Sequence, residues 1–243
     1  MGATGGLDCA VTEREGLVVT IDGPAGSGKS STAREVARRL GFRHMDSGAF
    51  YRALTYGLLD AGVGPGRWEG LTTPDLEGVG VSVQPTDMGF RVLLGSRSPE
   101  AEIRSSRVTA HVSRLAGLSV VRSWLLGIQR DAGRAGRLVA DGRDMGTVVF
   151  PGAEVKVFLT ADLPERARRR LTEQGVVGPS AAEIVRETAR IGERDRGDSE
   201  RELSPLRCPE DALELDTTYL TFEEQVKAIM ERVREVDGLL RQA

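Results

Sequence analysis

Hydrophobic and polar positions along the chain alternate between two kinds of segment. Short apolar runs rich in β-branched residues predict buried strands, and longer segments with apolar positions three or four apart predict amphipathic helices. The predicted strands are 17–21, a short strand within 43–48, 137–141, 155–160 and 212–216; the predicted helices are 31–40, 49–59, 101–132 with a break near Gly117, 164–174, 180–196 and 221–241. This alternation predicts a doubly wound α/β fold, with a parallel sheet, helices on both faces and ligands at the carboxyl ends of the strands.

One region departs from the alternation of strand and helix. Residues 62–74 hold several Gly and Pro and are expected to form a loop. Two apolar segments follow, 79–83 and 90–94, joined by a short polar stretch, and they predict an antiparallel hairpin. A hairpin inside a chain that otherwise alternates strand and helix indicates an inserted module on the substrate side of the fold.

Composition excludes several classes of protein. Of 243 residues, 40% are hydrophobic and 28% charged, which supports one large domain with a soluble surface. No apolar run approaches the ~20 residues of a membrane span, and a net charge of −3 does not favour a nucleic-acid or membrane binder. The two isolated cysteines make cytoplasmic localisation the default. Residues 1–15 are expected to form a disordered extension.

The strongest motif follows the first predicted strand. Gly23-Pro24-Ala25-Gly26-Ser27-Gly28-Lys29-Ser30 matches G-x-x-x-x-G-K-[ST], and a predicted helix begins at Ser31. Glycines let successive backbone N–H groups turn inward, which forms an anion nest at a helix N-terminus. Lys29 can reach the β- and γ-phosphates, and the Ser30 hydroxyl can bind Mg²⁺. We therefore expect residues 23–31 to bind the phosphates of ATP; the alternative is an ordinary glycine-rich turn.

A second candidate site lies at the end of the strand 137–141. Asp141 follows an apolar run, as expected of a residue that binds Mg²⁺ directly or through water, although an aspartate before Gly142 also fits a simple turn. In the segment DGRDMG, Arg143 suits a phosphate, and Asp144, which only accepts hydrogen bonds when ionised, suits an exocyclic amine or a ring N–H. The alternative for this segment is a salt-bridged turn.

Two clusters of arginine lie late in the chain. The first is Arg166, Arg168, Arg169 and Arg170; the second is Arg186, Arg190, Arg194, Arg196 and Arg201, interleaved with acidic residues. Charged helices of this kind are usually solvated surface. The functional alternative is a mobile lid whose arginines close over phosphates and exclude water.

Together these motifs predict a donor phosphate site, a metal and a second phosphate site. A GTPase switch would need only the first two, and the chain, with three lysines, has no N-K-x-D guanine motif. Transfer from ATP to an acceptor that bears a phosphate fits better. Two alternatives stay open: a related P-loop kinase with another acceptor, and a non-catalytic nucleotide-binding module.

The motifs closely resemble those of the bacterial-type cytidylate (CMP) kinase family. The resemblance rests on IDGPAGSGKS (21–30), DSGAFYR (46–52), the EIR…V stretch (102–108), ADGRDMGTVVFPGAEVKVFL (140–159) and ERDRGDSERELSPL (193–206), and it covers nearly the whole chain. It implies a P-loop nucleoside monophosphate kinase fold with an inserted CMP-binding module that contains antiparallel strands, and a short lid. It also implies a monomer with ATP and Mg²⁺ as cofactors and CMP and dCMP as substrates, converted to CDP and dCDP.

The resemblance also implies roles for individual residues. Those in the acceptor site would be Ser47, Arg52, Ser113, Arg122, Arg143, Asp144, Arg194, Asp198 and Arg201. Of these, Asp144 would recognise the cytosine amino edge and Asp198 the ribose. Arg143, Arg194 and Arg201 would act with Lys29 in catalysis, and Ser30 and Asp141 would hold the metal.

The same resemblance implies a division of the chain. The kinase domain would span 16–243, with a core of 16–45 and 134–243, a CMP-binding region of about 46–133 and a lid of about 166–204. The acceptor phosphate has a second pKa of about 6, so it is mostly a dianion at neutral pH and needs no general base. His44 and His111 are therefore not expected to act as a general base, and both are expected to be surface or core residues.

Overall fold

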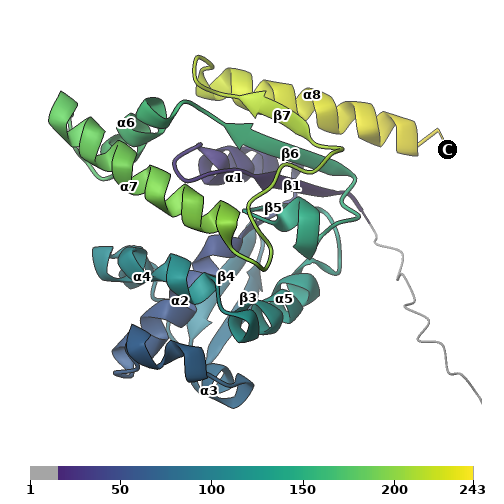
Figure 1. The fold of residues 1–243 in the computed structure, drawn as a ribbon. Helices are drawn as coiled ribbons and strands as arrows, with labels where there is room; N and C mark the ends of the chain where they lie inside the picture. The colour runs from purple at the N-terminus through teal and green to yellow at the C-terminus, as the bar shows by residue number, and fades with distance from the viewer. Residues whose placement is uncertain (1–15, 243) are drawn as a thin grey trace, which may run out of the picture.

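The computed structural model describes residues 16–242, so the expected extension at 1–15 lies outside the described residues. Seven strands form one sheet in the order β3-β4-β2-β5-β1-β6-β7 (Figure 1). All neighbouring strands are parallel except β3 and β4, which form an antiparallel hairpin. The strands are β1 (Val18–Asp22), β2 (Arg43–Asp46), β3 (Val81–Thr86), β4 (Gly89–Leu94), β5 (Leu138–Gly142), β6 (Val155–Thr160) and β7 (Leu213–Asp216).

Helices cover both faces of the sheet, as the sequence predicts for a doubly wound fold. They are α1 (Lys29–Leu40), α2 (Ser47–Asp60), α3 (Thr73–Gly78), α4 (Ser106–Ala116), α5 (Ser119–Gly133), α6 (Leu163–Glu173), α7 (Ala181–Glu200) and α8 (Phe222–Leu240). Short helical turns are η1 (Pro65–Gly70), η2 (Glu102–Arg104) and the π-helical η3 (Met145–Val149). No helix within residues 16–242 combines the length and the apolar character needed to cross a membrane.

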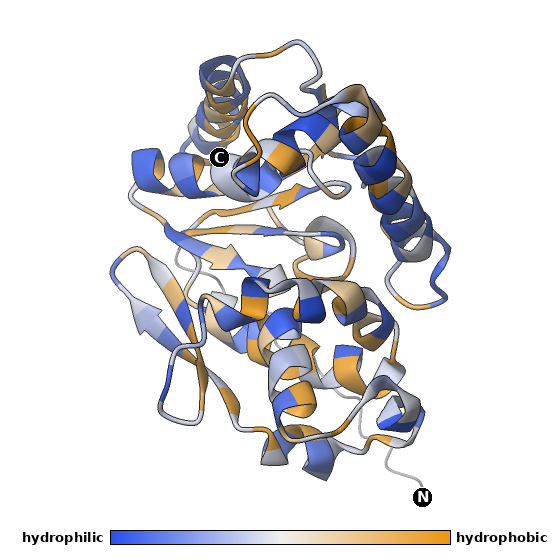
Figure 2. Ribbon diagram, turned by 90° about the vertical axis from the view of Figure 1, so that its left-hand side faces the viewer, coloured by the Kyte–Doolittle hydropathy of each residue, from blue (hydrophilic) through white to orange (hydrophobic). Residues whose placement is uncertain are grey.

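Two hydrophobic cores lie on opposite faces of the sheet. Val19 and Ile21 of β1 pack with α1 and α8 on one face, while Val18 packs with α2, α4 and α5 on the other. This division follows from the alternation of side chains along a strand. Figure 2 shows hydrophobic residues concentrated on the strands and on the inner sides of the helices. Because β1 lies between β5 and β6 and is fully buried, the loop that follows it is anchored in the centre of the fold.

The structure confirms the hairpin and the helix break at Gly117, and it corrects the loop expected at 62–74. Residues 65–70 form η1, and α3 begins at Thr73 with a capping box between Thr72 and Asp75. Trp68 of η1 is completely buried, so tertiary packing orders a stretch whose Gly and Pro content suggests a loop. The hairpin also joins the main sheet, because Gly89 of β4 pairs in parallel with His44 of β2.

Candidate active site

The Gly-rich loop between β1 and α1 has the geometry of an anion-binding nest. Gly28 adopts a left-handed conformation with φ of 86° and serves as the N-cap of α1, which begins at Lys29. Gly26 has φ of 73°, and a Cβ there would lie 2.9 Å from the carbonyl oxygen of Arg166. The first N–H groups of a helix have no intrahelical partner, so this turn presents donors to a bound phosphate. The structure therefore has the predicted order of strand, loop and helix, with the helix beginning at Lys29 rather than Ser31.

Lys29 is held inside the same loop. Its side chain is buried, and Nζ donates a hydrogen bond of 3.0 Å to the carbonyl oxygen of Pro24. Burial, together with repulsion by Arg143 and Arg194, lowers the pKa of Lys29 to about 7, against the attraction of Asp141 and Asp195. A buried ammonium group is costly without an anionic partner. A phosphate that enters the loop would provide that partner for Lys29.

The loop is clamped at Ala25 by side chains from two distant helices. The Ala25 N–H donates to Asp195 Oδ1 of α7 at 2.8 Å, and the Ala25 carbonyl accepts a 3.0 Å bond from Arg166 of α6. Arg166 and Asp195 also form a salt bridge with each other. Both polar atoms of Ala25 are thus satisfied by one ion pair, which ties the loop to α6 and α7.

Ser30 and Asp141 meet where the metal is expected. Ser30 Oγ donates to Asp141 Oδ2 at 2.5 Å, because β1 and β5 are parallel neighbours and end at the same edge. A hydroxyl and a carboxylate are oxygen ligands of the kind that Mg²⁺ binds together with waters and substrate phosphates. These residues therefore fit Mg²⁺ shared with a nucleotide. Within residues 16–242 no three His, Cys, Asp or Glu side chains form a cluster that could hold a metal ion in the absence of a nucleotide.

His44 contacts this pair, an interaction that the sequence does not predict. Its Nε2 lies 2.8 Å from Asp141 Oδ1, and its side chain is only 11% exposed. Burial raises the pKa of Asp141, but the contacts with His44 and Ser30 outweigh it and leave the pKa below its usual value. His111 does pack structurally, since its ring lies edge-on to Trp68 with centroids 6.0 Å apart.

A cluster of arginines surrounds Asp198 beside the Gly-rich loop. Arg143 Nε donates to Asp198 Oδ2 at 2.9 Å, and Arg201 lies 3.6 Å from Oδ1. Burial raises the pKa of Asp198, but Arg143, Arg194 and Arg201 together hold it below its usual value. Arg201 also donates from Nε to the carbonyl oxygen of Ser204 at 2.7 Å, and Ser204 has a strained φ of 49°. The carboxylate of Asp198 therefore interacts with three arginines, Arg143, Arg194 and Arg201.

The arginines of this cluster outnumber the acids that could neutralise them. Burial and the charges of Arg143, Arg52 and Arg170 lower the pKa of Arg194 to about 9, although Asp198 raises it. Arg52 of α2 behaves alike: burial, followed by Arg170, lowers its pKa to about 10. Arg194 Nε is buried without a hydrogen-bond partner among the described residues. Arginines held together against repulsion form a site that is completed by an anion.

Asp144 lies deeper, paired with another arginine. Asp144 Oδ2 accepts a hydrogen bond from Arg122, and both side chains are buried. Arg122 also donates to the carbonyl oxygen of Ala116 and lies over the ring of Tyr51. Buried charges are costly unless paired, so this pair is tightly constrained in position. It therefore presents charged hydrogen-bonding groups with a fixed orientation beside the arginine cluster.

The remaining predicted residues surround the same region. Ser47 begins α2 and is buried, and a Cβ on Gly142 would lie 2.5 Å from its Oγ, so the two segments approach closely. Asp46 caps α2, because its side chain accepts a hydrogen bond from the Ala49 N–H. Ser113 is partly buried on α4, a helix that contacts α7. The structure thus brings together the predicted residues of α2, α5, the segment after β5 and the C-terminal part of α7, whereas Ser113 is linked to them only through the contact of α4 with α7.

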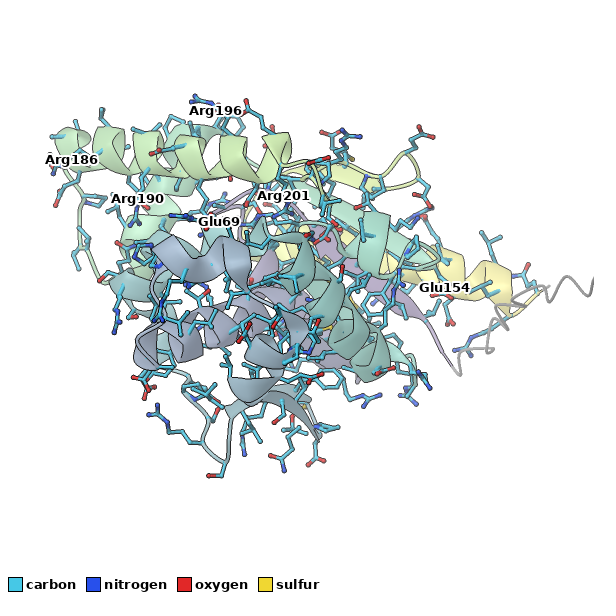
Figure 3. The ribbon with its side chains drawn as sticks, turned by 60° about the horizontal axis from the view of Figure 1, so that its bottom comes forward. Glu69, Glu154, Arg186, Arg190, Arg196 and Arg201 are labelled. Carbon is cyan, nitrogen blue, oxygen red and sulfur yellow. The ribbon has the colours of Figure 1, made fainter. Side chains whose placement is uncertain are left out.

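The structure also separates the arginines of α6 and α7 into different environments. On α7, Arg186, Arg190 and Arg196 are exposed, and Arg190 pairs with Glu187 (Figure 3). On α6, Arg168 is exposed and pairs with Glu165, whereas Arg169 bonds to Thr217. Ordinary solvated surface is therefore the correct interpretation for part of each cluster, whereas Arg166, Arg170, Arg194 and Arg201 are tied to the site.

A parallel sheet with a Gly-rich phosphate loop, a serine–aspartate pair and a buried arginine cluster defines a P-loop phosphotransferase. A family model described as cytidylate kinase matches residues 19–235. The chain is 44% identical to the cytidylate kinase of Salinibacter ruber over 91% of this chain and 99% of that protein. It is 44% identical to that of Geobacillus kaustophilus, over 91% and 98% respectively. The chain belongs to the cytidylate kinase family, which confirms the resemblance.

A solved gluconokinase from Sinorhizobium meliloti 1021 is a more distant relative in structure. It covers 95% of this chain and 99% of its own, with a TM-score of 0.49 and 16% identity. A likeness at this level does not bear on the assignment. The family is shown by the sequence comparisons, and the fold class by the order and direction of the strands.

Proposed function

We propose that this protein transfers the γ-phosphoryl group of ATP to the phosphate of CMP and of dCMP, with release of ADP and formation of CDP and dCDP. A bond forms between an acceptor phosphate oxygen and the γ-phosphorus, and the bond from that phosphorus to the ADP oxygen breaks. The observation that carries the proposal is the buried arginine cluster around Asp198, which lies beside the Gly-rich loop and lowers the pKa of Arg194.

The proposed mechanism relies on positioning and charge. Lys29 and the N–H groups of the loop would hold the ATP phosphates, while Arg52, Arg143 and Arg201 hold the acceptor phosphate in line with the γ-phosphorus. Arg194 would neutralise charge on the transferring group. No proton needs to be removed, because the acceptor phosphate is mostly a dianion at neutral pH.

The base would be recognised by the Arg122–Asp144 pair. The amino group of cytosine is a donor, and its ring N3 is an acceptor. A carboxylate and a guanidinium side by side match this order, with Asp144 accepting from the amino group and Arg122 donating to N3 or O2. Uracil has a carbonyl acceptor in place of the amino donor and an N3–H donor in place of the N3 acceptor, so it does not match this pair. Ser113, also from the resemblance, would add a hydroxyl contact, and Ser47 would lie against the acceptor phosphate.

We also propose that Ser30 and Asp141 hold Mg²⁺, directly or through water. When bound, the ion would supply positive charge that offsets the negative charge of the nucleotide phosphates. The hydrogen bonds to His44 and Ser30 keep Asp141 ionised, as a ligand must be. Chelation should therefore abolish turnover, and Mg²⁺ should restore it.

The division into core, CMP-binding region (46–133) and lid (166–204) also remains a proposal. The packing of α6 against α7, with Ala25, Ala167 and Ile191 in a small separate hydrophobic cluster, supports the idea that the two helices act as one unit. We further propose that the protein acts in the cytoplasm as a monomer. Size-exclusion chromatography with light scattering should give a mass near 26.2 kDa.

A coupled assay of ADP release tests the proposed reaction. The enzyme is supplied with MgATP and with CMP, dCMP, UMP, AMP, GMP or no acceptor. Strong turnover with CMP and dCMP, weak turnover with UMP and negligible release without an acceptor would support it. Equal slow release under all conditions would instead indicate a bare ATPase or a nucleotide-binding switch, and activity with another acceptor alone would indicate a different kinase.

A further inference from the structure

Asp22, the last residue of β1, holds a turn that belongs to a different part of the chain. Its carboxyl group is 1% exposed. Oδ1 accepts a 2.9 Å bond from the Met145 N–H, and Oδ2 accepts a 2.7 Å bond from the Gly146 N–H. These are the first N–H groups of η3, and Asp144, the N-cap residue, provides no side-chain cap for them. Asp22 therefore satisfies donors that the turn itself leaves free.

The capped turn directly follows the two residues that face the proposed acceptor. Arg143 reaches Asp198, and Asp144 reaches Arg122, within three positions of the atoms that Asp22 holds. The turn is also packed tightly, because a Cβ on Gly146 would lie 2.8 Å from Thr20 Oγ1. A displacement of this backbone would move both side chains relative to the Gly-rich loop, which continues from Asp22 itself.

We propose that Asp22 is a positioning residue for the acceptor nucleotide: its carboxylate fixes the backbone at Met145 and Gly146 and thereby sets the places of Arg143 and Asp144. The inference rests on the proposed function, since it assigns the affected nucleotide to the acceptor site. Asp22 makes no contact with either nucleotide in this role. It acts through the turn, so its removal should affect the acceptor far more than the donor.

The ionisation of Asp22 supports this role and gives it a pH signature. Burial raises the pKa of Asp22 to about 7; the backbone bonds from Gly146 and Met145 and the charge of Lys29 lower it, and Asp144 raises it. Cys208 also faces it, since Asp22 raises the pKa of that thiol after burial and Glu214. A protonated carboxyl group matches two N–H donors less well than a carboxylate. The acceptor KM should therefore rise as the pH falls below about 7.

Asp22→Asn tests the proposal with little risk to folding. The folded-state pKa lies above the unfolded value of 3.8, so stability falls as the pH rises from about 4 to about 7, and the loss stays constant above that pH. Removing the charge should leave the Tm at pH 8 unchanged or higher. The amide offers one acceptor in place of two, so one N–H of the turn loses its partner. Asp216→Asn is the matched control, because Asp216 also ends a strand and caps a local turn at Thr218, but it is exposed.

The measurements are the KM values for CMP, UMP and ATP, kcat and Tm, each from pH 6 to 9. We expect Asp22→Asn to raise the KM for CMP about 10- to 100-fold, with the KM for ATP within about twofold. The CMP/UMP selectivity should fall, and the difference in CMP KM from wild type should shrink below pH 7, where the acceptor's own titration affects both proteins equally. Gly146→Ala, which displaces the same turn by a steric clash, should raise the KM for CMP but keep the wild-type pH profile.

The outcomes are distinct. An unchanged KM for CMP with a lower Tm would overturn the proposal and leave Asp22 as a structural residue only. An equal rise in the KM for ATP would also overturn it, because the Gly-rich loop would then be what Asp22 positions. If wild-type enzyme turns over none of the pyrimidine acceptors, the proposed function itself is wrong, and this result is separate from any effect of the variants.

Discussion

Replacing Arg194 by methionine should stabilise the protein in the absence of nucleotide. Burial and the charges of Arg143, Arg52 and Arg170 lower the pKa of Arg194 from 12.5 to about 9, despite the attraction of Asp198. A depression of this size corresponds to roughly 5 kcal/mol of unfavourable electrostatic free energy. We expect a bound anion to offset this unfavourable free energy. In the absence of an anion, a neutral side chain of similar length avoids it.

The net gain should be smaller than this electrostatic cost. Arg194→Met also loses the attraction of Asp198, although Asp198 keeps Arg143 and Arg201 as partners. Replacement of a whole buried ion pair by apolar side chains is often neutral or stabilises a protein by about 1–4 kcal/mol, which sets the scale for the net gain here. For a chain of this size, 1 kcal/mol shifts the Tm by about 2–4 °C. We therefore expect a rise of about 3–10 °C without nucleotide. Loss of charge stabilisation at the transferring phosphoryl group should reduce kcat by about a thousandfold.

Thermal unfolding followed by circular dichroism measures the Tm without nucleotide and the increase in Tm that CMP causes. CMP should raise the Tm of wild type more than that of Arg194→Met. Arg168→Met is the matched control, since Arg168 is exposed and paired only with Glu165, and its Tm and kcat should stay close to wild type. A lower Tm for Arg194→Met in the absence of nucleotide would refute the reasoning, because Arg194 would then contribute to stability rather than oppose it.

Three further substitutions test other parts of the site. Lys29→Ala should abolish turnover while thermal unfolding stays cooperative, because the buried Lys29 is placed for phosphate and not for packing; near-normal turnover would remove it from the mechanism. Asp144→Ala should reduce the CMP/UMP ratio of kcat/KM about tenfold. It should also lower the free energy of unfolding by about 3–5 kcal/mol, because Arg122 stays buried without its partner. An unchanged CMP/UMP ratio would show that Asp144 does not recognise the base. Asp195→Asn keeps an acceptor for the Ala25 N–H but weakens the pair with Arg166, so the KM for ATP should rise about five- to tenfold with little change in that for CMP; the opposite pattern would contradict a role in shaping the donor loop.

Local signals in the sequence predict much of this fold. The apolar run before Gly23 and the motif that follows it identify β1 and the Gly-rich loop, because both depend on neighbouring residues. The helix ends are less well predicted: α7 continues to Glu200, four residues beyond the expected end. The capping box of Thr72 and Asp75 and the prolines of η1 and α3 are signals that could have revealed short helices in the expected loop.

Features that depend on strand order could not be predicted in this way. His44 reaches Asp141 only because β2 lies next to β5, with His44 opposite Val139 on the same face. The local sequence around His44 does not contain that information. The same holds for Asp22, whose partners are 123 and 124 residues away. The motifs therefore identify the residues that we propose to bind nucleotide, whereas the residues that hold them in place can be recognised only from the assembled sheet.

The clamp at Ala25 has a consequence for the synthesis of this protein. The Gly-rich loop is complete in sequence near the start of the chain, but Arg166 and Asp195 lie 141 and 170 residues beyond Ala25. The sheet neighbours of β1 also come more than a hundred residues later. A chain emerging from the ribosome therefore carries the whole phosphate-binding motif long before it can shape the loop. Contacts so distant in sequence also slow folding. Because ATP stabilises only a chain whose phosphate-binding loop is already formed, it can favour only the last stage of folding, after α7 has docked.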